Sequence, residues 1–445
     1  MTRREFVTAA GIGGAAIVAA VNRALAAFGL QGTQRPDRKP NILFILADDY
    51  GIGEVGCYGA DNYKTPNIDA LARGGIRYTH AYTVPLCGPS RACILTGRYG
   101  FRTGATNQDS TGRMKPSVET MIPSILKPAG YVSAMIGKWG QLPLKPADFG
   151  FDDYLTFSGS GIYWSSQDKG KTYVANGKNT PLADKQYMPD LMHQRAVEFM
   201  TRHRDRPFYL FYSLSHVHAE TLPTPDSAPD SKDLHADNVA YMDKLVGKIV
   251  AELDRLKLRE NTLVIFVGDN GTANPKASRA TIGGRPLSGT KGSMLEGGAL
   301  VPLIANWAGT APAGVVSSEM IDSTDFLPTF AELAGAALPA KTVVDGRSFA
   351  PQLRGGKGQP REWAFIQLAK MWYVREAGWK LNQAGELFDM KNAPFEEKRV
   401  PAGTADPAAV AARTRLKAAL DKLNPAGGIL DDGDGSGRHA NRKKS

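Results

Sequence analysis

The 445-residue sequence is poor in cysteine, with Cys57, Cys87 and Cys93 as its three examples. Three cysteines in so long a chain cannot build a disulfide framework, so they give no firm indication of an oxidising compartment. No Walker phosphate loop, zinc-ligand spacing or internal repeat is present either. These absences exclude a disulfide-stapled scaffold, a P-loop nucleotide site and a repeat array.

The sequence also lacks a strongly one-sided charge. Lys and Arg number 54 against 44 Asp and Glu, a formal net charge of +10. The basic residues are scattered and do not form a stripe interleaved with aromatics, so we expect no nucleic-acid partner and favour an anionic substrate. A hydrophobic content of 42% is that of an ordinary globular protein that can bury a large core.

The N-terminal apolar run is shorter than the roughly 20 residues that a membrane-spanning helix needs. It follows the pair Arg3-Arg4 and ends before a small-residue stretch suited to cleavage after Ala26. This pattern resembles a twin-arginine export signal. An amphipathic first helix is the alternative, although three glycines at 11, 13 and 14 weaken it.

We therefore expect residues 1–26 to be a twin-arginine signal peptide. The export partner would be the twin-arginine translocase, and the protein would be periplasmic or secreted. No cysteine follows the cleavage site, so we expect no lipid anchor there.

Continuous apolar runs of strand length recur along the chain, as they do in parallel strands buried on both faces. Helical patterns lie between several of them, at 67–73 and 239–256. This alternation predicts an α/β fold with a mostly parallel central sheet flanked by helices. The runs are "NILFILADDYG" (41–51), 76–82, 131–136, 208–213, 263–267 and 300–305.

The pattern divides the chain into regions. A short polar linker at 35–40 leads into an α/β domain predicted over 38–345. The polar segment from Leu155 to Lys185 is interpreted as an inserted surface loop. Short segments in 346–423 predict a small C-terminal α+β subdomain, an antiparallel sheet plus a helix at 407–423. Residues 424–445 lack periodicity and are predicted to be disordered.

Two of the strand-like runs end in adjacent oxygen ligands. Asp48 and Asp49 follow the first run, and Asp269 and Asn270 follow "TLVIFVG". Each pair alone could be a solvated strand end or a helix cap. The carboxyl ends of two parallel strands can instead converge on one hard cation, which prefers carboxylate and amide oxygens. We expect Ca²⁺, with Mg²⁺ as the second choice.

The segment "VPLCGPSRACILTGRYG" (84–100) places Cys87 before a proline, with no histidine or acid nearby. A helix predicted from about Ser90 would put Cys87 at its N-terminal end, where the backbone N–H groups favour anions. A thiolate is conceivable there. A buried structural cysteine is the simpler interpretation, and it suits Cys57 and Cys93 better.

"CGPSRACILTGR" is similar to the sulfatase signature Cys-x-Pro-Ser-Arg-x-x-x-Leu-Thr-Gly-Arg and matches every defined position. The resemblance extends over about residues 40–389 and implies an alkaline phosphatase-like fold. In that family a formylglycine-generating enzyme oxidises the cysteine to formylglycine (3-oxoalanine) before folding. The hydrated aldehyde is then the nucleophile that attacks sulfur. Cys87 would therefore act through oxygen.

The resemblance also implies roles for the other motifs. "GKW" makes Lys138 a sulfate-binding cation, "GTKGSMLEGG" does the same for Lys291, and "SLSHVHAE" makes His218 the leaving-group histidine, with His216 beside it. Arg91 would neutralise the diol and the acids around it. The implied metal ligands are Asp48, Asp49, the modified residue 87, Asp269 and Asn270.

One position departs from the family pattern. Relatives commonly continue Gly-Lys-Trp with a histidine that is thought to help deprotonate the diol, and this chain has Gly140 followed by Gln141. Gln141 can form hydrogen bonds but cannot take the proton. His80 or His235 would serve as the base if the fold brought either one near.

The first hypothesis is thus a sulfatase that hydrolyses a small-molecule or carbohydrate sulfate monoester. A related phosphonate monoester or phosphodiester hydrolase is the second, because the same diol and metal can attack phosphorus. The pairs at 48–49 and 269–270 favour sulfate. A degenerate binder of anionic glycans without turnover is the third, and only the missing histidine supports it.

Overall fold

The computed structural model describes residues 38–157, 159, 163–166, 172–218 and 220–433. The predicted signal peptide at 1–26, the first half of the linker (35–37) and the last part of the predicted tail lie outside these residues. Contacts divide the chain into two units, Met1–Arg38 and Lys39–Ser445.

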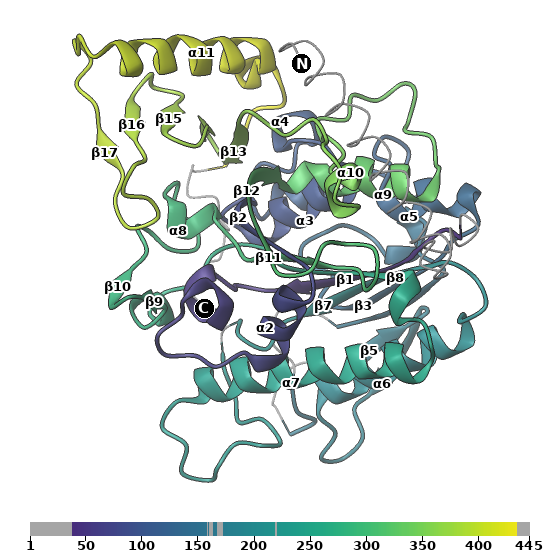
Figure 1. The fold of residues 1–445 in the computed structure, drawn as a ribbon. Helices are drawn as coiled ribbons and strands as arrows, with labels where there is room; N and C mark the ends of the chain where they lie inside the picture. The colour runs from purple at the N-terminus through teal and green to yellow at the C-terminus, as the bar shows by residue number, and fades with distance from the viewer. Residues whose placement is uncertain (1–37, 158, 160–162, 167–171, 219, 434–445) are drawn as a thin grey trace, which may run out of the picture. The chain divides into compact units, whose positions relative to one another are not determined.

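The second unit is built on a ten-stranded sheet with the order β12-β2-β11-β8-β1-β7-β3-β4-β5-β6 (Figure 1). The central strands pair in parallel, while β11, β5 and β6 run antiparallel to their neighbours. The predicted mostly parallel sheet is confirmed. Its strands are β1 (Asn41–Ala47), β2 (Ile76–Tyr82), β3 (Val132–Gly137), β4 (Asp153–Thr156), β5 (Thr172–Ala175), β6 (Lys178–Pro181), β7 (Phe208–Leu214), β8 (Thr262–Gly268), β11 (Leu303–Asn306) and β12 (Val315–Asp322).

The central strands form where the sequence has uninterrupted apolar runs. Every residue of β1, β7 and β8 is buried, because helices cover both faces of the sheet. The parallel register sets Ala47 of β1 beside Leu214 of β7 and Gly268 of β8. The residues that follow these strands therefore emerge at the same edge of the sheet.

Helices cover the sheet in two layers. One core cluster joins one face of the sheet to α3 (Cys87–Thr96), α5 (Ile122–Leu126), α9 (Phe326–Ala334) and α10 (Ala350–Leu353). A second cluster joins the other face to α2 (Pro66–Arg73), α6 (Met188–Arg202) and α7 (Leu234–Arg255). Figure 1 shows these helices on opposite sides of the sheet. Shorter helices are α4 (Gly100–Thr103) and α8 (Glu296–Ala299), and a small hairpin pairs β9 (Thr281–Ile282) with β10 (Arg285–Pro286).

The segment predicted as a loop from Leu155 to Lys185 contains regular structure. It completes β4 and adds the antiparallel hairpin β5–β6 to the edge of the sheet. The prediction is wrong for these residues because β6 is an edge strand with mostly exposed side chains, so it lacks the apolar alternation by which strands are recognised.

The C-terminal part forms a five-stranded antiparallel sheet covered by one helix, as predicted. The strands are β13 (Ala364–Leu368), β14 (Met371–Arg375), β15 (Trp379–Asn382), β16 (Leu387–Asp389) and β17 (Lys398–Arg399), and the helix is α11 (Pro407–Leu423). Phe349 and Leu353 belong to the core of the main sheet. The sheet of this subdomain begins at β13, later than the predicted boundary at 346.

Part of the predicted disordered tail is ordered. Pro425–Gly427 forms a 3-10 helix, and the backbone N–H of Ile429 donates to the carbonyl of Phe101 over 2.7 Å. The side chain of Asp431 is buried and bonded to Thr106 and Asn107. The described chain thus stays packed to Gly433, and residues 434–445 lie outside the description.

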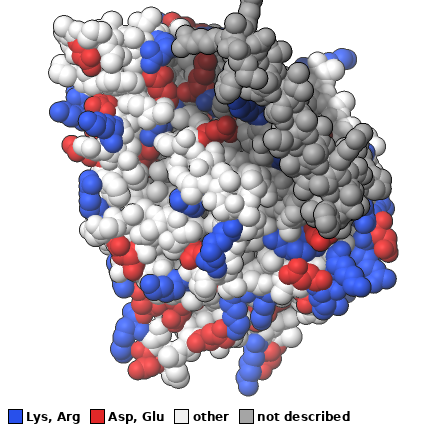
Figure 2. Space-filling model, in the orientation of Figure 1, with Lys and Arg blue, Asp and Glu red and all other residues white. Residues whose placement is uncertain are grey.

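No helix among the described residues combines the length and the apolar character needed to cross a membrane. On the face drawn in Figure 2, basic and acidic side chains are interspersed over the described surface. The net positive charge is therefore not collected into one basic patch on that face.

Candidate active site

The two predicted acidic pairs meet at the edge of the sheet. The N–H of Asp48 continues the ladder to Leu214 O over 3.0 Å, and the N–H of Asp269 bonds to Ala47 O over 2.9 Å. Beyond the strands, the Asp49 N–H donates to Asp269 Oδ1 over 3.0 Å, and Asn270 Nδ2 donates to Asp49 Oδ1 over 2.9 Å. The backbone of Asp49 is left-handed, with φ of 59°, which turns the chain sharply after β1.

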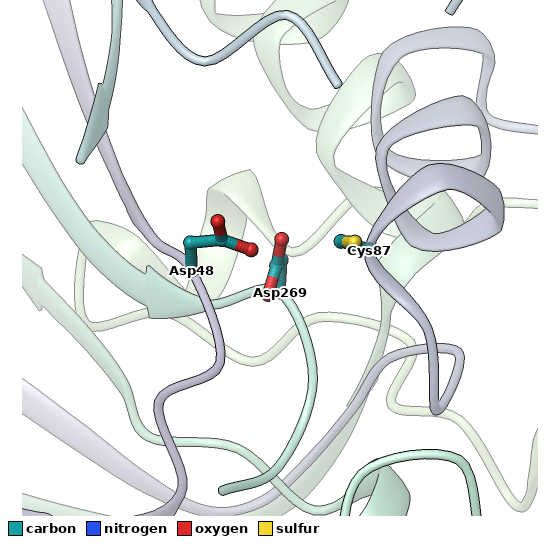
Figure 3. Close-up of side chains that lie close together, drawn as sticks. All are labelled: Asp48, Cys87 and Asp269. Atoms are coloured by element: carbon teal, nitrogen blue, oxygen red, sulfur yellow. The ribbon is translucent and has the colours of Figure 1, made fainter. Parts of the chain in front are cut away.

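Cys87 faces this acidic group from the first turn of α3. The helix begins at Cys87 itself, three residues before the predicted start at Ser90. Figure 3 shows the side chains of Asp48, Asp269 and Cys87 directed toward one another. One ligand atom of each lies within 4.8 Å of the others. The structure thus brings the signature cysteine and both strand ends to one point.

The Cys87 thiol is not activated as a thiolate. Its side chain is buried, and burial raises the pKa of Cys87 despite the opposing charge of Lys138, whose Nζ lies 3.7 Å from Sγ. Without conversion, residue 87 would therefore stay a neutral thiol at neutral pH. A neutral thiol is a poor nucleophile, so the geometry argues against direct thiolate chemistry.

Arg91 lies one turn along α3 and is fully buried. Its Nε and Nη2 both donate to Asp269 Oδ2, at 3.1 and 2.8 Å, and Nη2 lies 3.7 Å from Asp48 Oδ1. Its Nη1 donates to Lys138 O and Ser213 Oγ, each over 2.6 Å. Arg91 therefore links the ends of β8, β3 and β7 and holds Asp269 in place.

Lys138 follows β3 and is fully buried, which is rare for lysine. Its Nζ forms a short ion pair with Asp48 Oδ2. Burial alone would lower the pKa of Lys138, but Asp48 together with the other negative groups of the cluster outweighs burial, and the pKa is raised. Lys138 is therefore a fixed positive charge beside residue 87.

Lys291 and His218 lie on the other side of Asp49. Lys291 Nζ donates to Asp49 Oδ2 over 2.8 Å and lies 3.4 Å from His218 Nε2. That ring nitrogen is 3.7 Å from Asp49 Oδ2. Burial lowers the pKa of His218, so its imidazole is neutral at neutral pH, while Asp49 raises the pKa of Lys291 despite the opposing effect of burial.

The charges of the cluster act on one another. Burial would raise the pKa of Asp48, but the neighbouring cations, Lys138 foremost, together lower it well below its usual range. Burial and the neighbouring charge of Asp48 raise the pKa of Asp269. Three carboxylates (48, 49 and 269) thus face three permanent cations (91, 138 and 291).

The acidic residues fit a divalent cation. Asp48 Oδ1 and Asn270 Oδ1 are both buried with no hydrogen-bond partner among the described residues. Buried oxygens without a donor are costly, and a metal ion would satisfy both at once. The other candidate ligands are carboxylates, the donor set of a hard cation.

Gly140 occupies the position of the expected histidine and takes φ of +81°. A Cβ there would lie 3.1 Å from Arg91 Cδ. The two suggested substitutes are elsewhere: His235 pairs with Glu54, and His80 Nδ1 bonds to Thr79. Neither ring contacts Cys87 in the described part of the chain, so the suggestion that they act as the base is not supported.

His216, the neighbour of His218, is buried. Burial lowers its pKa to about 3, so it is neutral. Its two ring nitrogens have no hydrogen-bond partner among the described residues, and its ring lies near Tyr241. His216 therefore packs behind the site, and His218 faces the acids.

Gln108 was missed by the sequence analysis. Its Nε2 donates to Cys87 Sγ over 3.4 Å, and its Oε1 accepts the N–H of Gly88 over 3.1 Å. It lies 21 residues from Cys87, in a loop with no periodic pattern. No motif marks Gln108 in the sequence. A single sequence does not say which distant residues come to lie beside Cys87 in the folded chain.

The comparisons with known proteins agree with this geometry. The model of the Sulfatase family matches residues 40–336. The chain belongs to the sulfatase family. Its members share the alkaline phosphatase-like fold, and this sulfatase is a sulfuric ester hydrolase.

Curated relatives and solved structures support the assignment. The sulfatase is 33% identical to N-acetylgalactosamine-6-sulfatase of Canis lupus familiaris, over 75% of this chain and 69% of that protein. It is 35% identical to arylsulfatase A of Homo sapiens, over 74% and 70%.

Among solved structures, Ps i-CgsB in complex with k-i-k-neocarrahexaose has a TM-score of 0.76 and 27% identity, covering 87% of this chain and 93% of that one. The PsFucS1 sulfatase from Pseudoalteromonas sp. has a TM-score of 0.72 and 26% identity, covering 92% and 94%.

Proposed function

We propose that this sulfatase hydrolyses a sulfate monoester carried by a carbohydrate, at residue 87 after oxidation of Cys87 to formylglycine. The observation that carries the proposal is the convergence of the signature cysteine, two acidic strand ends and three buried or half-buried cations at one point. Such a site is built to attract an anion and to stabilise charge that grows on its oxygens.

The mode of attack follows from the state of residue 87. A buried thiol with a raised pKa is a poor nucleophile, and the fully matched signature supports the proposal that a formylglycine-generating enzyme converts this residue. A bound divalent cation would supply a Lewis acid. The hydrated aldehyde, once formed at residue 87, would supply an oxygen nucleophile.

The chain's own residues then divide the work. Lys138 Nζ lies 3.7 Å from Cys87 Sγ, the charge of Lys291 also acts on residue 87, and both lysines bind the sulfate oxygens. Arg91 orients Asp269 through its two hydrogen bonds and opposes the rise in the pKa of that carboxyl. The ring of His218, next to the cationic Lys291, gives a proton to the leaving alcohol; because burial lowers its pKa and leaves it neutral at rest, it must first take up that proton from water.

The proposed cation is Ca²⁺, held by Asp48, Asp49, Asp269, Asn270 and residue 87. The two strand-end pairs offer oxygen as they stand, residue 87 would do so once oxidised, and calcium accepts six to eight oxygen ligands in flexible geometry. Mg²⁺ is the second candidate. Dialysis against a chelator followed by readdition of each metal ion distinguishes them, with Ca²⁺ expected to restore the higher kcat.

A carbohydrate is the favoured organic half of the substrate. The Ps i-CgsB structure contains an oligosaccharide, and the N-acetylgalactosamine-6-sulfatase relative is named for an amino sugar. Aryl and steryl sulfatases are also among the relatives, so activity on an aryl sulfate is expected as well.

The site lies in a protein for which we also propose export. The N-terminal Arg3-Arg4 pair and the small-residue stretch to Ala26 favour transport through the twin-arginine translocase to the periplasm or beyond. Replacing both arginines with lysine is expected to leave the protein inside the cell, and unchanged export would contradict this part of the proposal.

The experiment that tests the function compares two esters on the same preparation. Paired aryl sulfate and phenyl phosphonate substrates are expected to give a higher kcat/KM for the sulfate. A higher value for the phosphonate would make the chain a phosphonate or phosphodiester hydrolase instead. No turnover of either, together with tight binding of a sulfated glycan, would favour a non-catalytic binder.

A further inference from the structure

Gln108 is the described polar side chain that contacts residue 87 without being an acid or a cation. Its carboxamide is nine-tenths buried, with 9% of the residue exposed. The amide can lie only one way round, because Oε1 accepts the Gly88 N–H over 3.1 Å and an NH₂ group could not. Nε2 is therefore the atom that faces Cys87 Sγ, at 3.4 Å.

The signature itself makes room for this contact. The second position of the signature is variable, and here it is Gly88. A Cβ at that position would lie 2.8 Å from Gln108 Oε1 and 3.2 Å from Thr111 Oγ1. Any side chain at 88 would thus push the carboxamide away from residue 87, so the glycine and the glutamine fit together.

Gln108 is also tied to the loop that lacks the expected histidine. Thr111 Oγ1 bonds to the carbonyl of Gln108 over 2.9 Å and to the carbonyl of Gln141 over 3.1 Å. Gly140 itself presents no side chain and lies against Arg91. The side chain that donates a hydrogen bond to residue 87 therefore comes from the 106–111 loop. The carbonyl of Gln141 holds that loop through its bond with Thr111.

The C-terminal segment holds the 106–111 loop in turn. Asp431 Oδ1 accepts hydrogen bonds from Thr106 Oγ1, over 3.0 Å, and from Asn107 Nδ2. Asp431 is 7% exposed. Its neighbour Asp432 is exposed and pairs only with the exposed Arg113 among its described contacts. Asp431 thus helps to hold the loop that carries Gln108, and Asp432 does not.

We propose that Gln108 is a further catalytic residue, whose amide donates a hydrogen bond to the reacting group on residue 87, and that Asp431 is a positioning residue that keeps Gln108 there. This inference rests on the proposed formylglycine chemistry, in which the Sγ atom stands for an oxygen on residue 87. Gln108 supplies a fixed hydrogen bond to residue 87 and transfers no proton.

The first test removes the donor in two independent ways. Gln108→Met keeps the side-chain volume, and Gly88→Ala displaces the carboxamide. Both are expected to lower kcat about tenfold or more while KM changes less than about twofold. Peptide mass spectrometry is expected to find residue 87 converted as in the wild type, because oxidation precedes folding.

A second readout does not depend on turnover. A hydrogen bond to the oxygen of residue 87 favours the hydrated form, so its loss exposes more aldehyde. Trapping of residue 87 by methoxyamine in the folded protein should be about threefold to tenfold faster in Gln108→Met than in the wild type. Wild-type kcat together with a wild-type trapping rate would overturn the role of Gln108.

The matched pair Asp431→Ala and Asp432→Ala tests the support. Asp431→Ala is expected to lower kcat and speed methoxyamine trapping in the same direction as Gln108→Met, and Asp432→Ala to leave both unchanged. Equal behaviour of the two variants would overturn the positioning role. If the wild type is active and its residue 87 is converted, wild-type behaviour of the variants counts against the roles of Gln108 and Asp431 alone. Failure of the proposed function would appear instead as an inactive wild type or as an intact thiol at residue 87.

Discussion

Two of the places where the protein buries charges differ in how completely their oxygens are paired. At the junction with the C-terminal sheet, Asp325 receives both Nε and Nη2 of Arg361, and Glu296 receives Arg375 and the hydroxyl of Tyr82. Both oxygens of each acid have donors. At the strand ends, Asp48 Oδ1 and Asn270 Oδ1 have no donor among the described residues.

The difference separates a structural cluster from a functional one. A buried ion pair whose hydrogen bonds are complete needs nothing else, and breaking it leaves an uncompensated charge. A buried cluster with oxygens left over has capacity for a ligand. We therefore expect substitutions at the strand ends to lower activity and leave the free energy of unfolding nearly unchanged. Substitutions at the junction should lower the free energy of unfolding and leave the activity of the folded protein unchanged.

The largest expected effect comes from Cys87→Ala. Activity should fall to background, a loss of about a thousandfold or more, because no group is left that can be oxidised. The melting temperature should stay near that of the wild type. Cys57→Ala is the matched control, since Cys57 lies outside the signature, and it is expected to keep full kcat. Wild-type rates for Cys87→Ala would show that residue 87 is not the nucleophile.

Asp269→Asn should have the next largest effect. The carboxylate would lose its charge toward both the metal and Arg91, so bound metal and kcat should fall together, with kcat lower by about a hundredfold or more. Elemental analysis of purified protein measures the metal. The exposed Asp421→Asn serves as control and should change neither quantity. Full metal content in Asp269→Asn would remove this residue from the ligand set.

At the junction, Arg361→Met should leave Asp325 buried without its partner. The expected cost is about 3 to 5 kcal/mol in the free energy of unfolding, measured by denaturant titration. The protein that remains folded at low temperature should keep its metal and its kcat. Lys417→Met breaks an exposed pair with Asp421 and should cost about 0 to 1 kcal/mol. Similar losses of stability in the two variants would mean that the buried Arg361–Asp325 pair matters no more to the fold than an exposed pair does.

The smallest effect is the most specific. His218→Ala should reduce kcat/KM for a sulfate with a poor leaving alcohol about tenfold more than for an activated aryl sulfate. The reason is that an activated aryl group needs no proton as it leaves. A series of aryl sulfates of increasing leaving-group pKa gives the slope, which should steepen in the variant. Identical slopes would mean that His218 only binds the substrate.

The sequence predicted the strand ends well because burial on both faces leaves an unbroken apolar run, and the polar residues after β1 and β8 stand out against it. It failed on β6, whose edge position leaves no apolar pattern. It also failed on residues 425–433, which are held by a backbone bond to Phe101 and by one buried acid, Asp431. Single contacts of this kind leave no periodic trace.

The site shows the same limit. The sequence predicted that the acidic pairs after β1 and β8, Lys138, Lys291 and His218 belong to one site, because each of them lies in a motif. Gln108 lies in none, and its contact with Cys87 exists only after the 106–111 loop folds against α3. The missing histidine was visible in the sequence, but Gln108 could be found only from the structure.

The central claim is that an oxygen on residue 87 attacks the ester. It is tested most directly by mass spectrometry of the peptide carrying residue 87, from protein purified from its native host and sorted by specific activity. The account predicts an aldehyde at this position, in a fraction that rises in proportion to kcat. Full activity in protein whose residue 87 is an intact thiol would contradict it.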